Sequence, residues 1–215
     1  MDRASPSGGE GGRFESSISR DMIVLASGSA RRKAILQALG IDFIAQTPIC
    51  DENVDPLLPI EKIPGFLSEK KIISVKDRLV PAAEKAKFIV AADTIVAFEG
   101  KYYGKPANRD EARNLLRMWS GKNHGVLSAI SVYNRSTLQM STHTVKNDIT
   151  FVKLTDREIE SYLDTNEWIG VAGAYRIQGR AAFFVKKIIG NWTAAVGLPV
   201  AELYTILHQQ GYNLL

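Results

Sequence analysis

The chain has 215 residues, of which 45% are hydrophobic and 23% are charged, and 27 Lys and Arg against 23 Asp and Glu give a net charge of +4. This length and composition fit one globular domain, or two closely joined lobes. No apolar stretch reaches the roughly 18 to 20 residues of a membrane-spanning helix, and no basic run or basic-aromatic alternation indicates nucleic-acid binding. The single Cys50 excludes an internal disulfide. We therefore expect a cytoplasmic protein that binds neither membrane nor nucleic acid, and its small basic excess suits a polyanionic small molecule.

The first 20 residues differ in composition from the rest. Residues 1–20 are rich in glycine, serine and charge, so they bury too little apolar surface to order themselves. We predict a disordered N-terminal tail over 1–20 and one folded domain over 21–215. The acidic residues of the tail argue against a transit peptide, and its lack of an apolar segment argues against a signal peptide.

Strands and helices alternate in the first half of the chain. Short apolar runs predict strands, and apolar residues at helical spacing predict helices. In chain order we expect a strand at 22–26, a helix at 30–39, a strand at 42–49, a helix at 66–79 and a central strand at 87–97.

Hairpins dominate the second half. We expect a turn back at 98–104, a helix from Asn108 to Gly121, a long hairpin of 125–134 and 140–152, a short helix capped by Thr155, a loop and strand within 172–188, and a helix whose first position is Pro199. The inward face of that last helix is predicted to hold Val200, Leu203, Tyr204 and Leu207. The combination predicts a mixed α/β fold, with helices around a mixed sheet.

A candidate anion site lies where the first predicted strand meets the first helix. Ser27, Gly28 and Ser29 end the strand and open the helix, so free backbone N–H groups meet the positive end of the helix dipole. Arg31 and Arg32 add positive charge in the first helical turn. The alternative is that Ser29 only caps the helix and that both arginines are solvated.

Asp93 is a candidate general base or metal ligand. It interrupts the apolar run IVAADTIV, where a buried carboxylate without a partner costs folding free energy. A carboxylate in a strand can ligate Mg²⁺ or take a proton from water, and Glu52 on a proline-rich loop is a candidate second oxygen ligand. The alternatives are a salt bridge from Asp93 to a lysine and a solvated position for Glu52.

Three more residues complete a possible nucleotide site. Lys105 lies in YYGKPAN, where the following proline restricts the backbone and aims the side chain, and Lys71 lies on the helix after the acidic loop. Together with the arginines and carboxylates, these lysines match the dispersed positive charge, divalent metal and positioned water that a triphosphate needs, although each alone is also a plausible surface charge. The amide of Gln178 in AYRIQG can pair with a base edge or simply stabilise a turn.

Four blocks of the sequence occur in a fixed order: LASGSARRKAIL, AADTIVAFEGKYYGKPANRDEARNLLRMWSGKNHGV, AGAYRIQG and GNWTAAVGLPV. This set resembles the Maf proteins, the septum-formation-inhibitor-like nucleotide pyrophosphatases. The likeness extends from about Met22 to the C-terminus. Two positions depart from the family pattern, because Ala30 replaces a usual proline and Ile72 replaces an alanine.

The resemblance implies a bent mixed sheet flanked by helices, with two lobes around a cleft, similar to inosine triphosphate pyrophosphatase and commonly dimeric. It implies hydrolysis of nucleoside triphosphates to the monophosphate and pyrophosphate with a divalent cation, Mg²⁺ or Mn²⁺. Asp93 would be the catalytic carboxylate and would share the metal with Glu52. The implied substrate-binding residues are Ser27, Ser29, Arg31, Arg32, Lys71, Thr94, Lys105 and Gln178. Lys70 is the alternative to Lys71, because Ile72 weakens the alignment there.

The resemblance also indicates a substrate. Arg31, Thr94 and Gln178 look like the dTTP/UTP branch of the family, whereas the 7-methyl-GTP branch tends to carry tryptophan at the position of Arg31. We therefore expect a pyrimidine nucleoside triphosphate such as dTTP or UTP, bound by a homodimer. The alternative is a non-catalytic nucleotide-binding regulator of cell division that acts through a protein partner.

Overall fold

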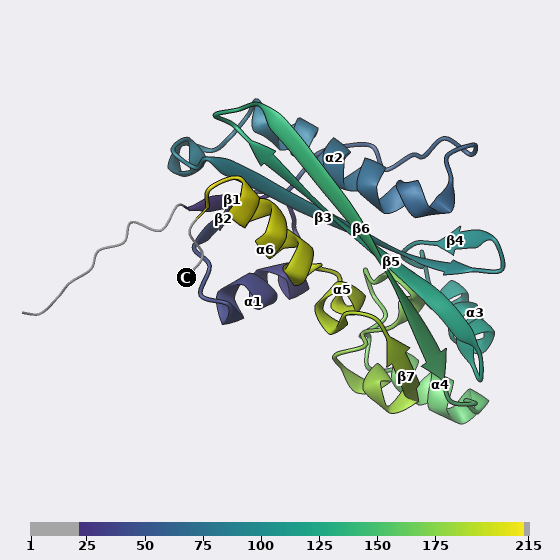
Figure 1. The fold of residues 1–215 in the computed structure, drawn as a ribbon. Helices are drawn as coiled ribbons and strands as arrows, with labels where there is room; N and C mark the ends of the chain where they lie inside the picture. Colours follow the sequence, from purple (N-terminus) through teal and green to yellow (C-terminus); the bar gives the residue numbers. More distant parts are fainter. Residues whose placement is uncertain (1–21, 213–215) are drawn as a thin grey trace, which may run out of the picture.

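One mixed sheet runs through the molecule. The structure is a computed structural model that describes residues 22–212, so the tail predicted at 1–20 lies outside the described residues. The seven-stranded sheet has the order β2-β1-β3-β5-β6-β7, with β4 also paired to β3 (Figure 1). β1 is parallel to β2 and β3, whereas the other pairs are antiparallel. The strands are β1 (Ile23–Leu25), β2 (Phe43–Ala45), β3 (Phe88–Phe98), β4 (Lys101–Tyr103), β5 (Asn123–Asn134), β6 (Gln139–Phe151) and β7 (Val185–Ile189).

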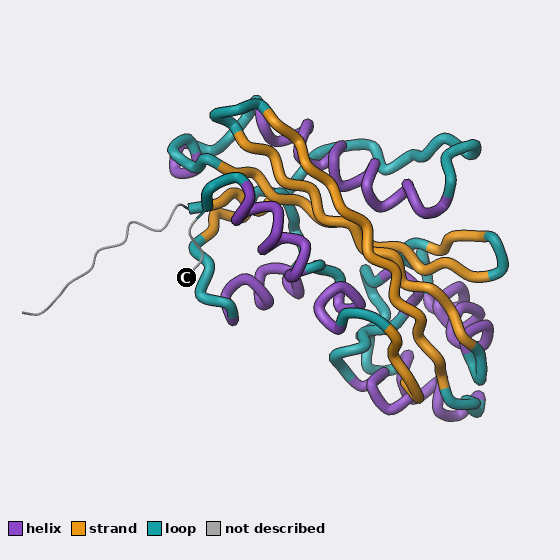
Figure 2. The backbone as a smooth tube through the Cα atoms, viewed as in Figure 1, coloured by secondary structure: helices purple, strands orange, loops and turns teal. Residues whose placement is uncertain are grey.

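Helices cover both faces of this sheet. They are α1 (Ala30–Ala38), α2 (Ile63–Lys76), α3 (Arg109–Trp119), α4 (Asp156–Leu163), α5 (Trp192–Val196) and α6 (Val200–Gln209). α2 lies on one side of the long strands and α1 and α6 lie on the other (Figure 1), while α3 and α4 gather at the far end of β5 and β6 (Figure 2). The predicted mixed α/β fold is therefore confirmed. No helix within 22–212 is long and apolar enough to span a bilayer.

The side chains of β3 alternate between the two helical layers. Val90 and Ala92 are buried with the apolar side chains of α1 and α6, whereas Ile89 and Ala91 are buried with those of α2. This is the two-residue period of a strand whose faces are both covered. Odd-numbered positions in this part of β3 therefore face α2, and even-numbered positions face α1 and α6.

The part of the molecule around α3, α4 and β7, which we call the second lobe, has its own core. α3 buries Leu115, Leu116 and Trp119, the stripe expected of an amphipathic helix, against α4 and the ends of β5 and β6. The Trp119 ring packs against Phe98 and His124, with centroids 5.6 and 4.8 Å away. The long strands β3, β5 and β6 extend from the core beneath α1, α2 and α6 into this second core. Both lobes are therefore built on the same sheet.

The sheet has a gap along one edge of β3. β1 pairs with β3 only as far as Leu25 opposite Val90, and β4 pairs with it only from Val96 opposite Tyr103. Within the described residues no strand pairs with that edge between these two points, while β5 pairs with the other edge along almost its whole length. The carboxyl end of the parallel strand β1 therefore opens onto unpaired strand backbone, which is where ligands commonly bind in α/β sheets.

Some boundaries differ from the sequence prediction. α2 begins at Ile63 rather than at residue 66, because Pro64 is tolerated in the first turn of a helix, where its missing N–H is not needed. Pro199 is the N-cap of α6 rather than its first residue. The predicted inward position of Tyr204 was wrong, since Tyr204 is 45% exposed and Ile206 is buried in its place. Leu203, Ile206 and Leu207 form a three- and four-residue spacing that keeps one face buried.

Candidate functional site

The gap in the sheet opens into a cleft of about 470 Å³. Its walls are the turn from β1 into α1, the loop before α2, the exposed edge of β3, the turn after β4 and the segment before β7. Every site residue predicted from the sequence lines this cleft, except Gln178. Arg176 and Thr47 also line it and were not predicted.

The β1–α1 turn presents the amino end of α1 to the cleft. Ser27, Gly28 and Ser29 all line the cleft, and the backbone N–H of Ser29 donates to Ser27 Oγ over 3.1 Å. Ser29 is the N-cap of α1, yet its side chain makes no capping hydrogen bond. The alternative that Ser29 serves only as a cap therefore has no support in the hydrogen bonding, and this helix end is suited to an anion.

Arg32 is held firmly at the base of the cleft. Its Nε donates to the carbonyl oxygen of Gly197 over 2.8 Å, and its Nη atoms donate to Ser27 Oγ and Thr94 Oγ1 over 3.4 and 3.3 Å. Burial lowers the pKa of Arg32, and the nearby Asp93 and Glu52 carboxylates oppose that shift. Since three elements fix the guanidinium, Arg32 is not the solvated surface charge that the sequence left open.

A lysine bridges the two carboxylates. The Lys71 ammonium forms ion pairs with Asp93 Oδ1 and, over 3.0 Å, with Glu52 Oε1. Lys71 and Asp93 are 6% and 8% exposed, because odd-numbered Asp93 on β3 faces α2. Lys105 approaches the other Glu52 oxygen at 3.7 Å. Burial raises the pKa of Glu52, but its hydrogen bond to Lys71 and the two ammonium charges outweigh burial and hold the pKa below its ordinary value.

The structure distinguishes the two adjacent lysines of α2. Lys71 lies in the cleft, whereas Lys70 points to the exposed loop and donates to the carbonyl oxygen of Asn53 over 3.4 Å. Successive helix residues differ in direction by about 100°, so only one of the two can face β3.

Arg31 joins the cleft to a second, smaller hollow. Arg31 and Thr94 line both, while Gln178 lines only the small one, whose volume of about 20 Å³ is room for about one water molecule. Burial and, to a smaller extent, the charges of Arg32 and Arg176 together lower the pKa of Arg31 to about 10. Gln178 is thus beside the predicted cleft rather than within it.

Arg176 is the charged cleft residue that sequence reasoning missed. It lies in the same AYRIQG block as Gln178, between the buried side chains of Tyr175 and Ile177, and its side chain turns the other way into the large cleft. An arginine between two apolar residues in a loop was the available signal. The sequence did not show that this loop returns to α1.

The two carboxylates suit a hard divalent cation. Glu52 and Asp93 both form ion pairs with the Lys71 ammonium, so their carboxylate oxygens lie on the same side of the cleft. Residues 22–212 contain no group of three or more His, Cys, Asp or Glu side chains that would enclose a metal ion. One or two protein carboxylates with the remaining ligands from phosphate and water is the usual arrangement for Mg²⁺, and the residues present fit it.

These features define a mixed α/β protein with a cleft at a break in its sheet, in which cationic side chains from several segments surround a carboxylate pair. The chain belongs to the Maf family, because the family described as Maf-like protein matches residues 22–210. The resemblance seen in the four sequence blocks is therefore confirmed.

Curated relatives cover nearly the whole chain. The dTTP/UTP pyrophosphatase of Treponema denticola is 39% identical over 202 residues, which span 90% of this chain and 98% of that protein. The dTTP/UTP pyrophosphatases of Pelotomaculum thermopropionicum and Caldicellulosiruptor saccharolyticus are 38% and 39% identical, over 90% of this chain and 98% and 96% of those proteins. Among solved structures, the Ham1 protein of Staphylococcus aureus matches with a TM-score of 0.36 at 15% identity, covering 63% of this chain and 72% of that one. That likeness is too weak to carry a conclusion.

Proposed function

We propose that this protein hydrolyses pyrimidine nucleoside triphosphates, such as dTTP or UTP, to the monophosphate and pyrophosphate. The observation that carries the proposal is the convergence of Arg31, Arg32, Lys71 and Lys105 on one cleft with the carboxylate of Asp93 at its base. A triphosphate needs dispersed positive charge, and its hydrolysis needs a group that positions water. The curated relatives named as dTTP/UTP pyrophosphatases support the substrate class.

Asp93 is the catalytic residue in this proposal. Its ion pair with Lys71 fixes the orientation of the carboxylate, which accepts a proton from an attacking water as the water approaches the α-phosphorus. The bond from the α-phosphorus to the bridging oxygen breaks, and pyrophosphate leaves. Lys71, Lys105 and the amino end of α1 stabilise the charge that develops on the phosphates.

A divalent cation, Mg²⁺ or Mn²⁺, is the proposed cofactor. Glu52 and Asp93 would hold it, and it would neutralise phosphate charge when bound. Their present partner is the Lys71 ammonium, so the same oxygens are already arranged for a positive charge.

The base-binding residue in this proposal is Gln178. Its amide borders the small hollow next to Arg31 and Thr94, which would have to widen to admit a pyrimidine, since the hollow measures about 20 Å³. A site that pairs with the carbonyl and imide edge discriminates against bases that leave its polar groups unpaired. The homodimer and the cytoplasmic location remain predictions.

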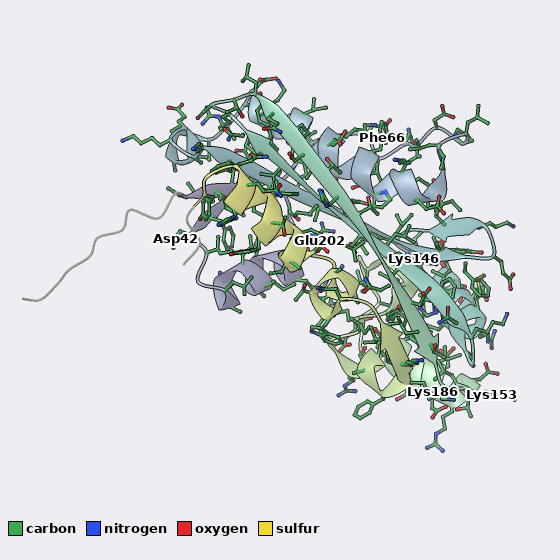
Figure 3. The ribbon with its side chains drawn as sticks, viewed as in Figure 1. Asp42, Phe66, Lys146, Lys153, Lys186 and Glu202 are labelled. Atoms are coloured by element: carbon green, nitrogen blue, oxygen red, sulfur yellow. The ribbon has the colours of Figure 1, made fainter. Side chains whose placement is uncertain are left out.

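A nucleotide panel with a matched pair of variants tests the proposal. The enzyme is incubated with dTTP, UTP, CTP, dATP and GTP in the presence of Mg²⁺, and pyrophosphate is measured after conversion to phosphate. We expect dTTP and UTP to be preferred, and Asp93→Asn to lower kcat by about 100-fold or more, as for the loss of a general base. Asp42→Asn is the control, because Asp42 is exposed at the edge of the molecule near β2 (Figure 3). Near-normal pyrophosphate release by Asp93→Asn would overturn the assignment.

The same assay separates the alternative function. A non-catalytic regulator of cell division would bind nucleotides yet release no pyrophosphate from any member of the panel. No residue of the cleft favours that function over hydrolysis, because the catalytic carboxylate is present and faces the cations.

A further inference from the structure

We propose that Arg176 binds the polyphosphate of the substrate as a partner of Arg31. The inference rests on the proposed function and deepens it, because it adds to the site a cation that the sequence analysis did not assign. Arg176 comes from the segment before β7 and Arg31 from α1, and both line the same cleft. A ligand held by both arginines is therefore bound by two separate segments of the chain.

Neither arginine has a protein partner for its charge. Within residues 22–212, the Arg31 and Arg176 side chains form no hydrogen bond and no ion pair, and the Nε of Arg176 is buried without an acceptor. By contrast, Arg109 and Arg113 both form ion pairs with the Glu160 carboxylate. A buried guanidinium N–H without an acceptor costs free energy, and a bound anion would relieve that cost.

The two guanidinium groups also repel each other. Both side chains line the same cleft, and the charge of Arg176 is one of the causes that lower the pKa of Arg31. Like charges are held together without a counter-ion only where the surrounding structure fixes them. An anion between them converts this repulsion into two charge-assisted contacts.

The position of Arg176 selects phosphate rather than the base. Arg176 lines the large cleft with Lys105 and Asp93, whereas Gln178, two residues later, lines only the small hollow. The segment thus divides its side chains between the two compartments, with Arg176 in the large cleft and Tyr175, Ile177 and Gln178 around the small hollow. The guanidinium therefore meets the charged part of a nucleotide while Gln178 meets the neutral part.

The fold holds this segment in place before any ligand binds. The backbone N–H of Arg176 donates to the Tyr162 hydroxyl over 3.0 Å. The preceding Tyr175 hydroxyl lies 2.7 Å from His124 Nε2, and Gly173 accepts from Trp119 Nε1 over 2.9 Å. These anchors at and just before Arg176 fix its backbone, so little backbone conformational entropy is lost when the arginine binds an anion.

Inorganic tripolyphosphate tests the inference without turnover. Calorimetric titration compares the intact protein with Arg176→Gln, with the conservative Arg176→Lys and with Arg180→Gln. Arg180 is the matched control, because it is exposed on the same segment and does not line the cleft. We expect the Kd for tripolyphosphate to rise about tenfold to a hundredfold in Arg176→Gln, the range for one charge-assisted hydrogen bond. Arg176→Lys should recover part of this loss, and Arg180→Gln should leave the Kd unchanged.

Two outcomes overturn the inference. One is unchanged tripolyphosphate affinity in Arg176→Gln, and the other is an equal loss in the Arg180→Gln control. Thermal melting of each variant separates a binding defect from unfolding, and Arg176→Lys keeps the test available should Arg176→Gln fail to fold. If the intact protein binds tripolyphosphate through Arg176 but hydrolyses no nucleotide, the proposed function fails and this inference stands.

Discussion

Gly173 occupies a position that no other residue fits. Its φ of +70° lies in the left-handed region, and a Cβ there would stand 2.5 Å from Cγ2 of Val96 on β3. Its N–H donates to the carbonyl oxygen of Gly104 over 3.0 Å, which ties the Arg176 segment to the turn that carries Lys105. One glycine therefore sets the distance between two walls of the cleft.

Substituting this glycine should destabilise the protein. For Gly173→Ala we expect the free energy of unfolding to fall by about 3 kcal/mol, from the steric overlap and the left-handed backbone together. Urea denaturation followed by circular dichroism measures it. Gly104→Ala is the control, since a Cβ at Gly104 meets nothing within 4 Å. Equal stability of the two variants would contradict the packing described for Gly173.

His124 makes stability depend on pH. Burial among aromatic rings lowers its pKa to about 4 from the ordinary 6.5. The unfolded chain therefore binds a proton on acidification before the folded protein does, so this contribution is complete above pH 6.5 and is lost as the pH falls toward 4. Between pH 7.5 and 5 the loss is about 2 kcal/mol.

Urea denaturation at pH 7.5 and pH 5 measures this dependence. His124→Phe should remove most of it while keeping the ring packing. The three carboxylates with lowered pKa values, Glu52, Glu158 and Glu160, stay ionised in the folded protein across this range and do not obscure the result. A wild-type pH dependence in His124→Phe would show that another group is responsible.

At the scale of elements, α3 and α4 are joined by charge and by capping. Arg109 and Arg113 on α3 bond to Glu160 on α4, and these two hydrogen-bonded guanidinium groups hold the pKa of Glu160 at about 2. All three side chains are partly exposed, so the network orients the helices more than it stabilises them. The short helix α4 then depends on its amino end, where Thr155 and Glu158 form a capping box.

Removing the Thr155 cap of α4 should lower the free energy of unfolding by a measurable amount. The Thr155 hydroxyl accepts from the Glu158 N–H over 3.3 Å, and the Glu158 carboxylate accepts from the Thr155 N–H over 2.7 Å. Thr155→Ala should lower the free energy of unfolding by about 1 kcal/mol. The comparison is Thr205→Ala in α6, whose exposed hydroxyl donates only to the Ala201 carbonyl oxygen within the helix, so a change within about 0.5 kcal/mol is expected. An equal cost at both sites would exclude capping as the cause.

The sequence predicted those elements whose signals are local. The capping residues Asn108 and Thr155 both cap helices as expected, because a side chain that bonds three residues ahead needs no distant partner. Asp93 could be singled out because a charge inside an apolar strand is costly unless something pairs with it. By contrast, α5 is only five residues long and shows no helical period.

Contacts made across the chain could not be predicted in the same way. Arg32 bonds to Gly197, 165 residues later, and Arg176 approaches Arg31 from a segment about as distant. Neither contact can be predicted from the spacing of residues along the sequence. The choice between Lys70 and Lys71 was left open because Ile72 weakens the alignment, and it depends on which face of α2 packs against β3, since neighbouring helical side chains differ in direction by about 100°.

At the scale of the whole molecule, a ligand bound in the cleft should stabilise the folded protein against unfolding. The cleft is walled by segments from both halves of the chain, so pyrophosphate bound there stabilises the folded state by its binding free energy alone. At 100 times its Kd this is about 2.7 kcal/mol, or a rise in Tm of about 5 to 10 °C.

Thermal melting with and without pyrophosphate measures this rise. Arg31→Gln should reduce it, whereas Lys186→Gln should not, because Lys186 lies with Lys153 at the far end of the second lobe (Figure 3). A rise that is the same in all three proteins would indicate binding outside the cleft.

The pairing of β3 with β5 runs without interruption from Phe88 to Ala97, past the cleft and into both lobes. A ladder of this kind resists bending, so the two halves are not free to swing about a hinge in the middle. Admitting a nucleotide base next to Gln178 must then depend on the side chains that line the small hollow rather than on a movement of the two lobes. The rate at which those side chains rearrange would limit how fast product escapes, whatever the speed of the bond-breaking step.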